Sequence, residues 1–127
     1  MVSGGMSMHD KVVFYVRQDF SDSSSESVAR KLSISDRTLR RRLAAEGFSF
    51  QEIVSALRYE QAQKALASTQ LSIGDIARFL GYSDASNFGH AFRQWSGMSP
   101  RQYRKQAPRP SAMMTAAHHS AVGMIGM

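Results

Sequence analysis

Three arginines lie within the five-residue stretch 37–41 in the first half of the chain. They are Arg37, Arg40 and Arg41. At about 100° per residue, the apolar Leu39 and Leu43 mark the buried side of a helix over 36–46, and the arginines fall opposite them with Ala44. A guanidinium group can donate two parallel hydrogen bonds to O6 and N7 of guanine, or pair with phosphate oxygens. The spacing therefore predicts a basic helical face suited to a major groove.

Polar residues flank this face and predict contacts with phosphates. Ser35, Thr38 and Arg42 lie toward one side, where a hydroxyl or guanidinium group suits a backbone phosphate. The alternative interpretation is a solvated basic surface that only keeps the protein soluble. We expect no Glu or Asp at i+4 spacing to neutralise the arginine row, and this expectation favours nucleic-acid binding.

A second helix, expected over 84–96, offers a polar and less charged face. Phe88 and Phe92 mark its buried side. The residues predicted to face outward or to flank that face are Ser86, Asn87, His90 and Arg93. An asparagine amide can pair with adenine, an imidazole can donate to a base or a phosphate, and an arginine suits a phosphate. The alternative for the histidine is an ordinary surface residue.

The positions of apolar residues predict the helices that must hold these two faces. Apolar residues at helical spacing, the N-cap Ser35 and helix-ending glycines indicate helices over 8–20, 26–32, 36–46, 50–68, 73–80 and 84–96. The run 21–25 is expected to be a polar connector. Gly47 and Gly97 are expected to end the two helices that carry the candidate faces.

Two parts of the chain repeat each other. Val28-Ala29, Leu32 and Ser35 recur as Ile76-Ala77, Leu80 and Ser83 at an offset of 48, Leu43 recurs as Phe92 at 49, and Gly47 recurs as Gly97 at 50. Each copy pairs a short bracing helix with a longer one, which is typical of a helix-turn-helix. The helix over 50–68 would span about 28 Å, close to the roughly 34 Å between successive major grooves on one side of B-DNA.

Composition narrows the remaining possibilities. The 127 residues carry a formal charge of +6, which favours a polyanionic partner, and contain no cysteine, which excludes disulfides, thiolate zinc sites and cysteine nucleophiles. No apolar run approaches the roughly 20 residues that cross a bilayer, and the first residues lack the pattern of a signal peptide. We therefore expect a soluble, cytoplasmic protein without a membrane partner.

These elements predict five segments along the chain. They are a leader over 1–7, a first helix-turn-helix subdomain over 8–47, a linker helix over 48–70, a second subdomain over 71–106 and a disordered tail over 107–127. In the tail, His118 and His119 are adjacent but lack further ligands nearby, so we expect no metal site. No cofactor is predicted.

The residues closely resemble the DNA-binding domain of the AraC/XylS family of bacterial transcription regulators. The stretch that carries the resemblance holds Ile73, Ile76-Ala77, Gly81-Tyr82, Phe88, Phe92-Arg93, Gly97, Ser99-Pro100 and Tyr103-Arg104. Similar positions upstream are Val28-Ala29, Leu32, Ser35, Thr38-Leu39, Leu43, Arg58, Ala62 and Leu66. The resemblance covers roughly residues 8 to 105.

The resemblance implies an all-α fold of seven helices, a homeodomain-like double helix-turn-helix joined by a long linker helix. It implies a monomeric domain that places two reading helices in successive major grooves. It also implies base contacts from the positions Arg37, Arg40, Arg41, Ala85, Ser86, Asn87 and His90. Because many members carry a separate effector-binding or dimerisation domain, the chain is expected to be either a small stand-alone regulator or a fragment of a longer one that could dimerise through its missing part.

The main hypothesis is thus a sequence-specific transcription regulator, more readily an activator than a repressor, that binds promoter DNA and contacts RNA polymerase. One alternative is an enzyme that uses the module for delivery, but the chain offers no cysteine and no clustered carboxylates for a catalytic metal. Another is a helical module whose basic face meets an acidic protein. The operator, the regulated genes and any effector are not encoded in these patterns.

Overall fold

The computed structural model describes residues 6–107, which form seven α-helices, one short 3-10 helix and no strand. The helices are α1 (Met8–Gln18), η2 (Phe20–Asp22), α2 (Ser25–Lys31), α3 (Asp36–Ala45), α4 (Phe50–Ser68), α5 (Ile73–Phe79), α6 (Ala85–Ser96) and α7 (Pro100–Gln106). The prediction of a seven-helix, all-α fold is confirmed. The predicted tail beyond Ala107 and the first five residues of the predicted leader lie outside the described residues.

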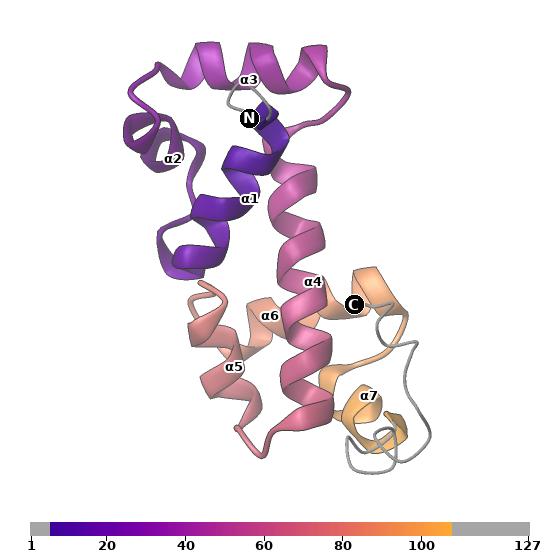
Figure 1. Ribbon diagram of the computed structural model, residues 1–127. Coiled ribbons are helices and arrows are strands. Elements are labelled where there is room, and N and C mark those ends of the chain that lie inside the picture. Colours follow the sequence, from indigo (N-terminus) through magenta and orange to yellow (C-terminus); the bar gives the residue numbers. More distant parts are fainter. Residues whose placement is uncertain (1–5, 108–127) are drawn as a thin grey trace.

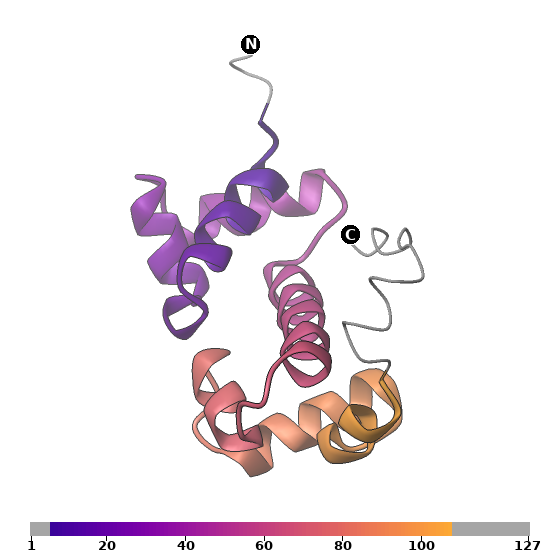
Figure 2. The same ribbon diagram turned by 60° about the horizontal axis from the view of Figure 1, so that its bottom comes forward.

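The long helix α4 stands between two groups of helices. Helices α1, α2 and α3 lie around its first half, and α5, α6 and α7 lie around its second half (Figure 1). The turned view shows α4 nearly end-on between the two groups (Figure 2). We call α1 to α3 the first unit and α5 to α7 the second unit.

Side-chain caps explain where the seven α-helices begin. In each case the preceding residue is extended and its side-chain oxygen accepts a hydrogen bond from an amide of the first turn. The capping residues are Ser7, Ser24, Ser35, Ser49, Ser72, Asp84 and Ser99. Each such cap stabilises a helix by about 1 kcal/mol. The closely spaced serines of this sequence therefore divide it into short helices.

The end of the first helix differs from the prediction. Helix α1 stops at Gln18 rather than Phe20, because Asp19 is extended and its carboxylate accepts hydrogen bonds from the amide and hydroxyl of Ser21. The 3-10 helix η2 then carries the ring of Phe20 into the core, where it is 3% exposed. The connector expected over 21–25 is therefore partly ordered, and its residue Ser23 is buried.

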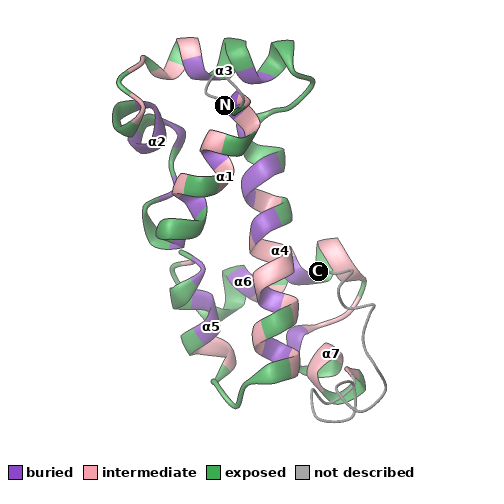
Figure 3. Cartoon of the chain, in the orientation of Figure 1, coloured by how far each residue is buried: buried purple, intermediate pink, exposed green. Residues whose placement is uncertain are grey.

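Helix α4 contributes to the core along its whole length. The apolar spacing within 50–68 predicts a buried stripe of Ile53, Leu57, Ala62, Ala65 and Leu66. Of these Ala65 is only partly buried, whereas Phe50 and Val54 are buried as well. Figure 3 shows buried residues along α4 from end to end. A helix packed between two units must bury more than one face, so one amphipathic stripe was too simple a description.

The turn inside each unit shows the repeat in three dimensions. Ser33, which follows α2, has φ of 61°, and its repeat partner Gly81, which follows α5, has φ of 93°. The second turn is longer, since α6 is capped by Asp84 whereas α3 is capped by Ser35. The second turn thus holds one extra residue, which accounts for the change in repeat offset from 48 to 49.

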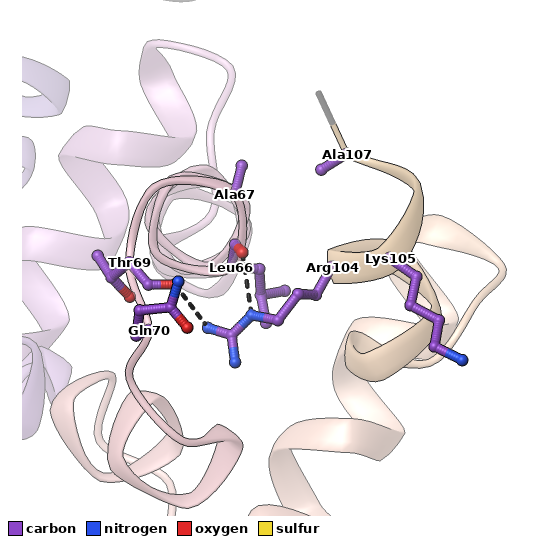
Figure 4. Close-up of a pocket in the computed structure, with 7 residues that line it drawn as sticks. All are labelled: Leu66, Ala67, Thr69, Gln70, Arg104, Lys105 and Ala107. Atoms are coloured by element: carbon purple, nitrogen blue, oxygen red, sulfur yellow. Dashed lines mark hydrogen bonds between the residues drawn. The ribbon is translucent and has the colours of Figure 1, made fainter. Parts of the chain in front are cut away.

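Helix α7 is fixed to the far end of α4 through Arg104. Its Nε donates to the carbonyl oxygen of Leu66 at 3.1 Å, and its Nη2 donates to that of Thr69 at 3.3 Å (Figure 4). A cationic group at a helix C-terminus satisfies free carbonyl oxygens and interacts favourably with the helix dipole. Arg104 therefore holds the second unit to α4 and belongs to the scaffold.

Candidate nucleic-acid interface

Helix α3 presents a basic face that the rest of the first unit leaves open. Leu39 and Leu43 are fully buried, as the spacing predicted. Arg37, Arg41 and Arg42 are all exposed. The side chains of Arg37, Arg41 and Arg42 form no ion pair among the described residues. Three guanidinium groups on the exposed side of one helix can donate to phosphate oxygens or to base edges.

Arg40 is placed differently from the other arginines. Its Nε donates to Oδ2 of Asp36 at 3.0 Å, and its Nη2 donates to the hydroxyl oxygen of Ser25 in α2 at 2.8 Å. The expectation that no carboxylate at i+4 spacing neutralises the arginine row is wrong, because Asp36 lies one turn before Arg40. The Arg40 side chain is still 58% exposed, so it lies on the flank of α3 that faces α2.

The charge of Asp36 is favoured by the same neighbours. The hydroxyl of Ser25 and then the guanidinium of Arg40 hold the pKa of Asp36 below its ordinary value, with burial acting in the opposite direction. Asp36 is therefore ionised at neutral pH and pairs with the Arg40 guanidinium. It also stands in the first turn of α3, where a negative charge is favoured by the helix dipole.

The two hydroxyls predicted to contact phosphates take part in the cap of α3. The Oγ of Ser35 accepts from the amide of Thr38 at 3.0 Å and donates to the Oγ1 of Thr38 at the same distance. Ser35 is exposed and Thr38 is partly buried. The hydroxyl of Thr38 stays at the start of α3, on the side predicted to face the DNA backbone.

Helix α6 presents the second predicted face. Phe88 and Phe92 are fully buried. The residues predicted to contact DNA from this helix, Ala85, Ser86, Asn87, His90 and Arg93, are all exposed. Four of them lie away from the buried side of α6, whereas Ala85 is exposed as the first residue of the helix, and the open side of α6 carries less positive charge than that of α3.

The side chain of Asn87 already has a partner. Its Nδ2 donates to the hydroxyl oxygen of Ser83 at 2.7 Å, and its amide nitrogen donates to the capping carboxylate of Asp84 at 2.8 Å. The bond to Ser83 leaves the Asn87 side-chain oxygen as an acceptor. This arrangement orients the Asn87 amide group at the N-terminal end of α6.

Gly89 does not leave a gap in the α6 face. A Cβ atom at this position would lie 4.0 Å from the Cδ atom of Pro100 in α7, so the position points toward α7. Its repeat partner at an offset of 49 is Arg40, which in the same way points toward a neighbouring helix. The lack of a side chain at Gly89 therefore leaves the exposed face that carries His90 unchanged.

Sequence reasoning gave Arg58 no role of its own, although the structure places it between the two units. Its Nη2 donates to the hydroxyl oxygen of Ser23 at 3.2 Å, and its Cζ lies 4.9 Å from the ring centroid of Tyr82. Two signals in the sequence point to it. Arg58 is among the positions that carry the family resemblance, and it is an arginine close to the apolar stripe of the linker helix, four residues before Ala62.

Other functional groups are not found in the described part of the chain. Among residues 6–107, no cluster of three His, Cys, Asp or Glu side chains could hold a metal ion. None of the helices in this range combines the length and hydrophobicity that a bilayer-spanning segment needs. His118 and His119 lie outside the described residues.

The geometry defines a class of protein, a double helix-turn-helix domain in which the second helix of each motif, α3 or α6, has an exposed polar face. Comparisons with known proteins agree with this class. The family described as "Helix-turn-helix domain" matches residues 28–106. The ornithine utilization regulator of Pseudomonas aeruginosa is 42% identical over 87 residues, which make up 68% of this chain and 25% of that protein.

Two solved structures are similar to the chain. The C-terminal domain of AraT, a response regulator from Geobacillus stearothermophilus, has a TM-score of 0.74 and 33% identity, covering 92% of this chain and 97% of that one. The DNA-binding domain of AdpA, a global transcriptional factor solved in complex with a target DNA, has a TM-score of 0.67 and 25% identity, covering 79% and 92%.

The chain belongs to the AraC-type family of helix-turn-helix transcription regulators. It spans about a quarter of the length of the curated relatives it matches.

Proposed function

We propose that this chain binds promoter DNA sequence-specifically by inserting α3 and α6 into successive major grooves of one duplex. The observation that carries the proposal is the exposure of Arg37 and Arg41 on α3 together with that of Ser86 and His90 on α6. Each helix is braced from behind by the short helix that precedes it, α2 or α5. A helix so braced can enter a groove about 12 Å wide.

The proposed roles differ between the two helices. Arg37 and Arg41 read guanine edges, and Arg40 approaches the duplex from the flank on which Asp36 and Ser25 hold it. On α6, Ala85 touches a thymine methyl group, and Ser86, Asn87 and His90 meet base edges. Ser35, Thr38, Arg42 and Arg93 contact phosphates, which fix the position of the protein without reading sequence.

Further parts of the proposal concern the whole regulator. We infer a transcription regulator, acting as an activator, that works in the cytoplasm, contacts RNA polymerase and has no catalytic activity of its own. This chain binds DNA as a monomer, since it carries two reading helices of its own. Because the chain matches about a quarter of the length of its curated relatives, dimerisation and effector binding belong to further domains of such regulators.

Selection from a random duplex pool, followed by fluorescence anisotropy titration, tests the proposal. At physiological salt we expect the selected duplex to bind at least about a thousandfold more tightly than random duplexes. The selected sequence should hold two short conserved blocks about one helical turn apart. Equal affinity for selected and random duplexes would show that the chain does not read sequence.

A further inference from the structure

The two units touch each other directly, in addition to being joined by α4. The 3-10 helix η2 of the first unit packs against α5 of the second, and the ring centroids of Phe20 and Phe79 are 5.9 Å apart. The backbone of Gly81 comes so close to η2 that a Cβ atom there would lie 2.6 Å from the carbonyl oxygen of Phe20. The units are thus in close contact where η2 meets the end of α5.

Arg58 lies beside this contact and bonds to both units. Its guanidinium group donates to Ser23, which directly follows η2, and lies over the ring of Tyr82, which is in the turn between α5 and α6. The hydroxyl of Ser23 in turn donates to the carbonyl oxygen of Phe20 at 2.8 Å. The same Arg58 Nη2 atom would lie 3.2 Å from a Cβ atom at Gly81.

Both partners of Arg58 lead on to a reading helix. On one side, Ser23 begins the segment that runs through α2 to α3, and the neighbouring Ser25 holds Arg40. On the other side, the ring of Tyr82 packs against that of Phe88 in α6, with centroids 5.6 Å apart. Arg58 is therefore the central member of a series of contacts that connects the start of the first helix-turn-helix to the reading helix of the second.

We propose that Arg58 is a positioning residue that fixes the separation and angle between α3 and α6, and thereby restricts the chain to one spacing between the two blocks of its DNA site. The inference rests on the proposed function. Each unit packs against α4, and η2 packs against α5, but these contacts are apolar and set no single direction. A guanidinium that binds both units adds a directional contact beside them and restricts rotation of one unit relative to the other, because its planar, five-donor group can hydrogen bond and stack at the same time.

The test uses the full chain and the duplex selected by the wild-type protein. Dissociation constants are measured for that duplex, for two derivatives with one base pair inserted or deleted between the blocks, and for a duplex that keeps only the first block. The variants are Arg58→Met, which keeps the apolar stem, and Arg58→Lys, which keeps the charge without the planar group. Arg17→Met is the matched control, since Arg17 joins α1 to Glu60 of α4 at 3.0 Å without reaching the second unit.

The expected result is a loss of discrimination between spacings. Wild-type protein and Arg17→Met should bind the derivatives with altered spacing about tenfold or more weakly than the selected duplex. In Arg58→Met this ratio should fall to nearly one, because affinity for the selected duplex drops about tenfold while affinity for the one-block duplex stays unchanged. Arg58→Lys should lie between the two, and it keeps the test decisive if Arg58→Met does not fold.

Two results would overturn the inference while leaving the proposed function standing. In the first, the wild-type protein selects a sequence but binds the selected duplex and the derivatives with altered spacing equally tightly. The other is an Arg58 variant, folded by circular dichroism, that keeps the wild-type ratio or loses as much affinity for the one-block duplex as for the selected one. A wild-type protein that selects no sequence would instead reject the proposed function itself.

Discussion

The guanidinium of Arg40 is held by the carboxylate of Asp36 one helical turn earlier, with 3.0 Å between Nε and Oδ2. Arg41, the next residue, is exposed and has no such partner among the described residues. Two neighbouring arginines in one helix are therefore unequal. One is bound to the protein, and the other is free to bind a ligand.

This inequality predicts different consequences of removing each arginine. Arg41→Ala should reduce affinity for the selected duplex by about 1 to 3 kcal/mol and relax the base preference at one position of the first block. Arg40→Ala should change base preference less and should lower the free energy of unfolding, because it removes the bonds of Arg40 to Ser25 and to Asp36. Titrations against single-base variants of the duplex, with urea unfolding of both proteins, compare them. Equal relaxation of base preference in both variants would contradict the assignment.

The Asp36 carboxylate predicts a pH dependence of stability. Its pKa in the folded chain lies below the ordinary value, so the unfolded chain binds more protons over the interval between the two pKa values. The stability contributed by the ionised carboxylate is present above the ordinary pKa and is lost as pH falls through the folded one. Wild-type protein should exceed Asp36→Asn in free energy of unfolding near neutral pH, and this difference should shrink in acid. A difference that is constant over this range would show that the carboxylate charge is unimportant.

The sequence predicted much of this fold because its local signals agree with one another. The bounds of α4 at Phe50 and Ser68 were predicted from the long apolar pattern, and the structure adds that Ser49 and Glu52 form a capping box at its start. The outward faces of α3 and α6 were predicted because two buried residues per helix, such as Leu39 and Leu43, set the orientation of the rest.

Contacts between distant segments could not be predicted from local patterns. The bond from Arg40 to Ser25 joins residues 15 apart, and the bond from Arg58 to Ser23 joins residues 35 apart. The buried state of Ser23 and Ser25 is equally invisible in a run of serines that looks like a solvated connector. The pairing of Arg40 with Asp36, by contrast, was present in the i+4 spacing and was overlooked.

Substitution of Gly81 should lower the free energy of unfolding more than substitution of an ordinary turn glycine. Gly97 also has positive φ, but a Cβ atom there would meet nothing within 4 Å, whereas one at Gly81 would lie 2.6 Å from the Phe20 carbonyl oxygen. Gly97→Ala should therefore cost about 1 kcal/mol through backbone strain alone. Gly81→Ala should cost clearly more and separate η2 from α5. Urea unfolding of both variants measures the difference. Similar losses of unfolding free energy would mean that η2 can move away from an added Cβ atom at little cost.

The salt dependence of binding separates phosphate contacts from base contacts. Affinity should fall steeply with salt, because each phosphate contact releases counterions. Arg42→Ala should weaken binding to selected and random duplexes by a similar factor and reduce the slope of log K against log salt by about one. Titrations at several salt concentrations provide the slope. A loss confined to the selected duplex would instead make Arg42 a base-reading residue.

The central claim is that α3 and α6 occupy neighbouring major grooves on one side of a single duplex. Protection of guanine N7 atoms from methylation, measured on the selected duplex with the full chain bound, tests it most directly because N7 lies in the major groove. We predict two protected regions centred about 10 base pairs apart on the same side of the duplex. Protection of a single region, or of two regions on opposite sides, would contradict the account.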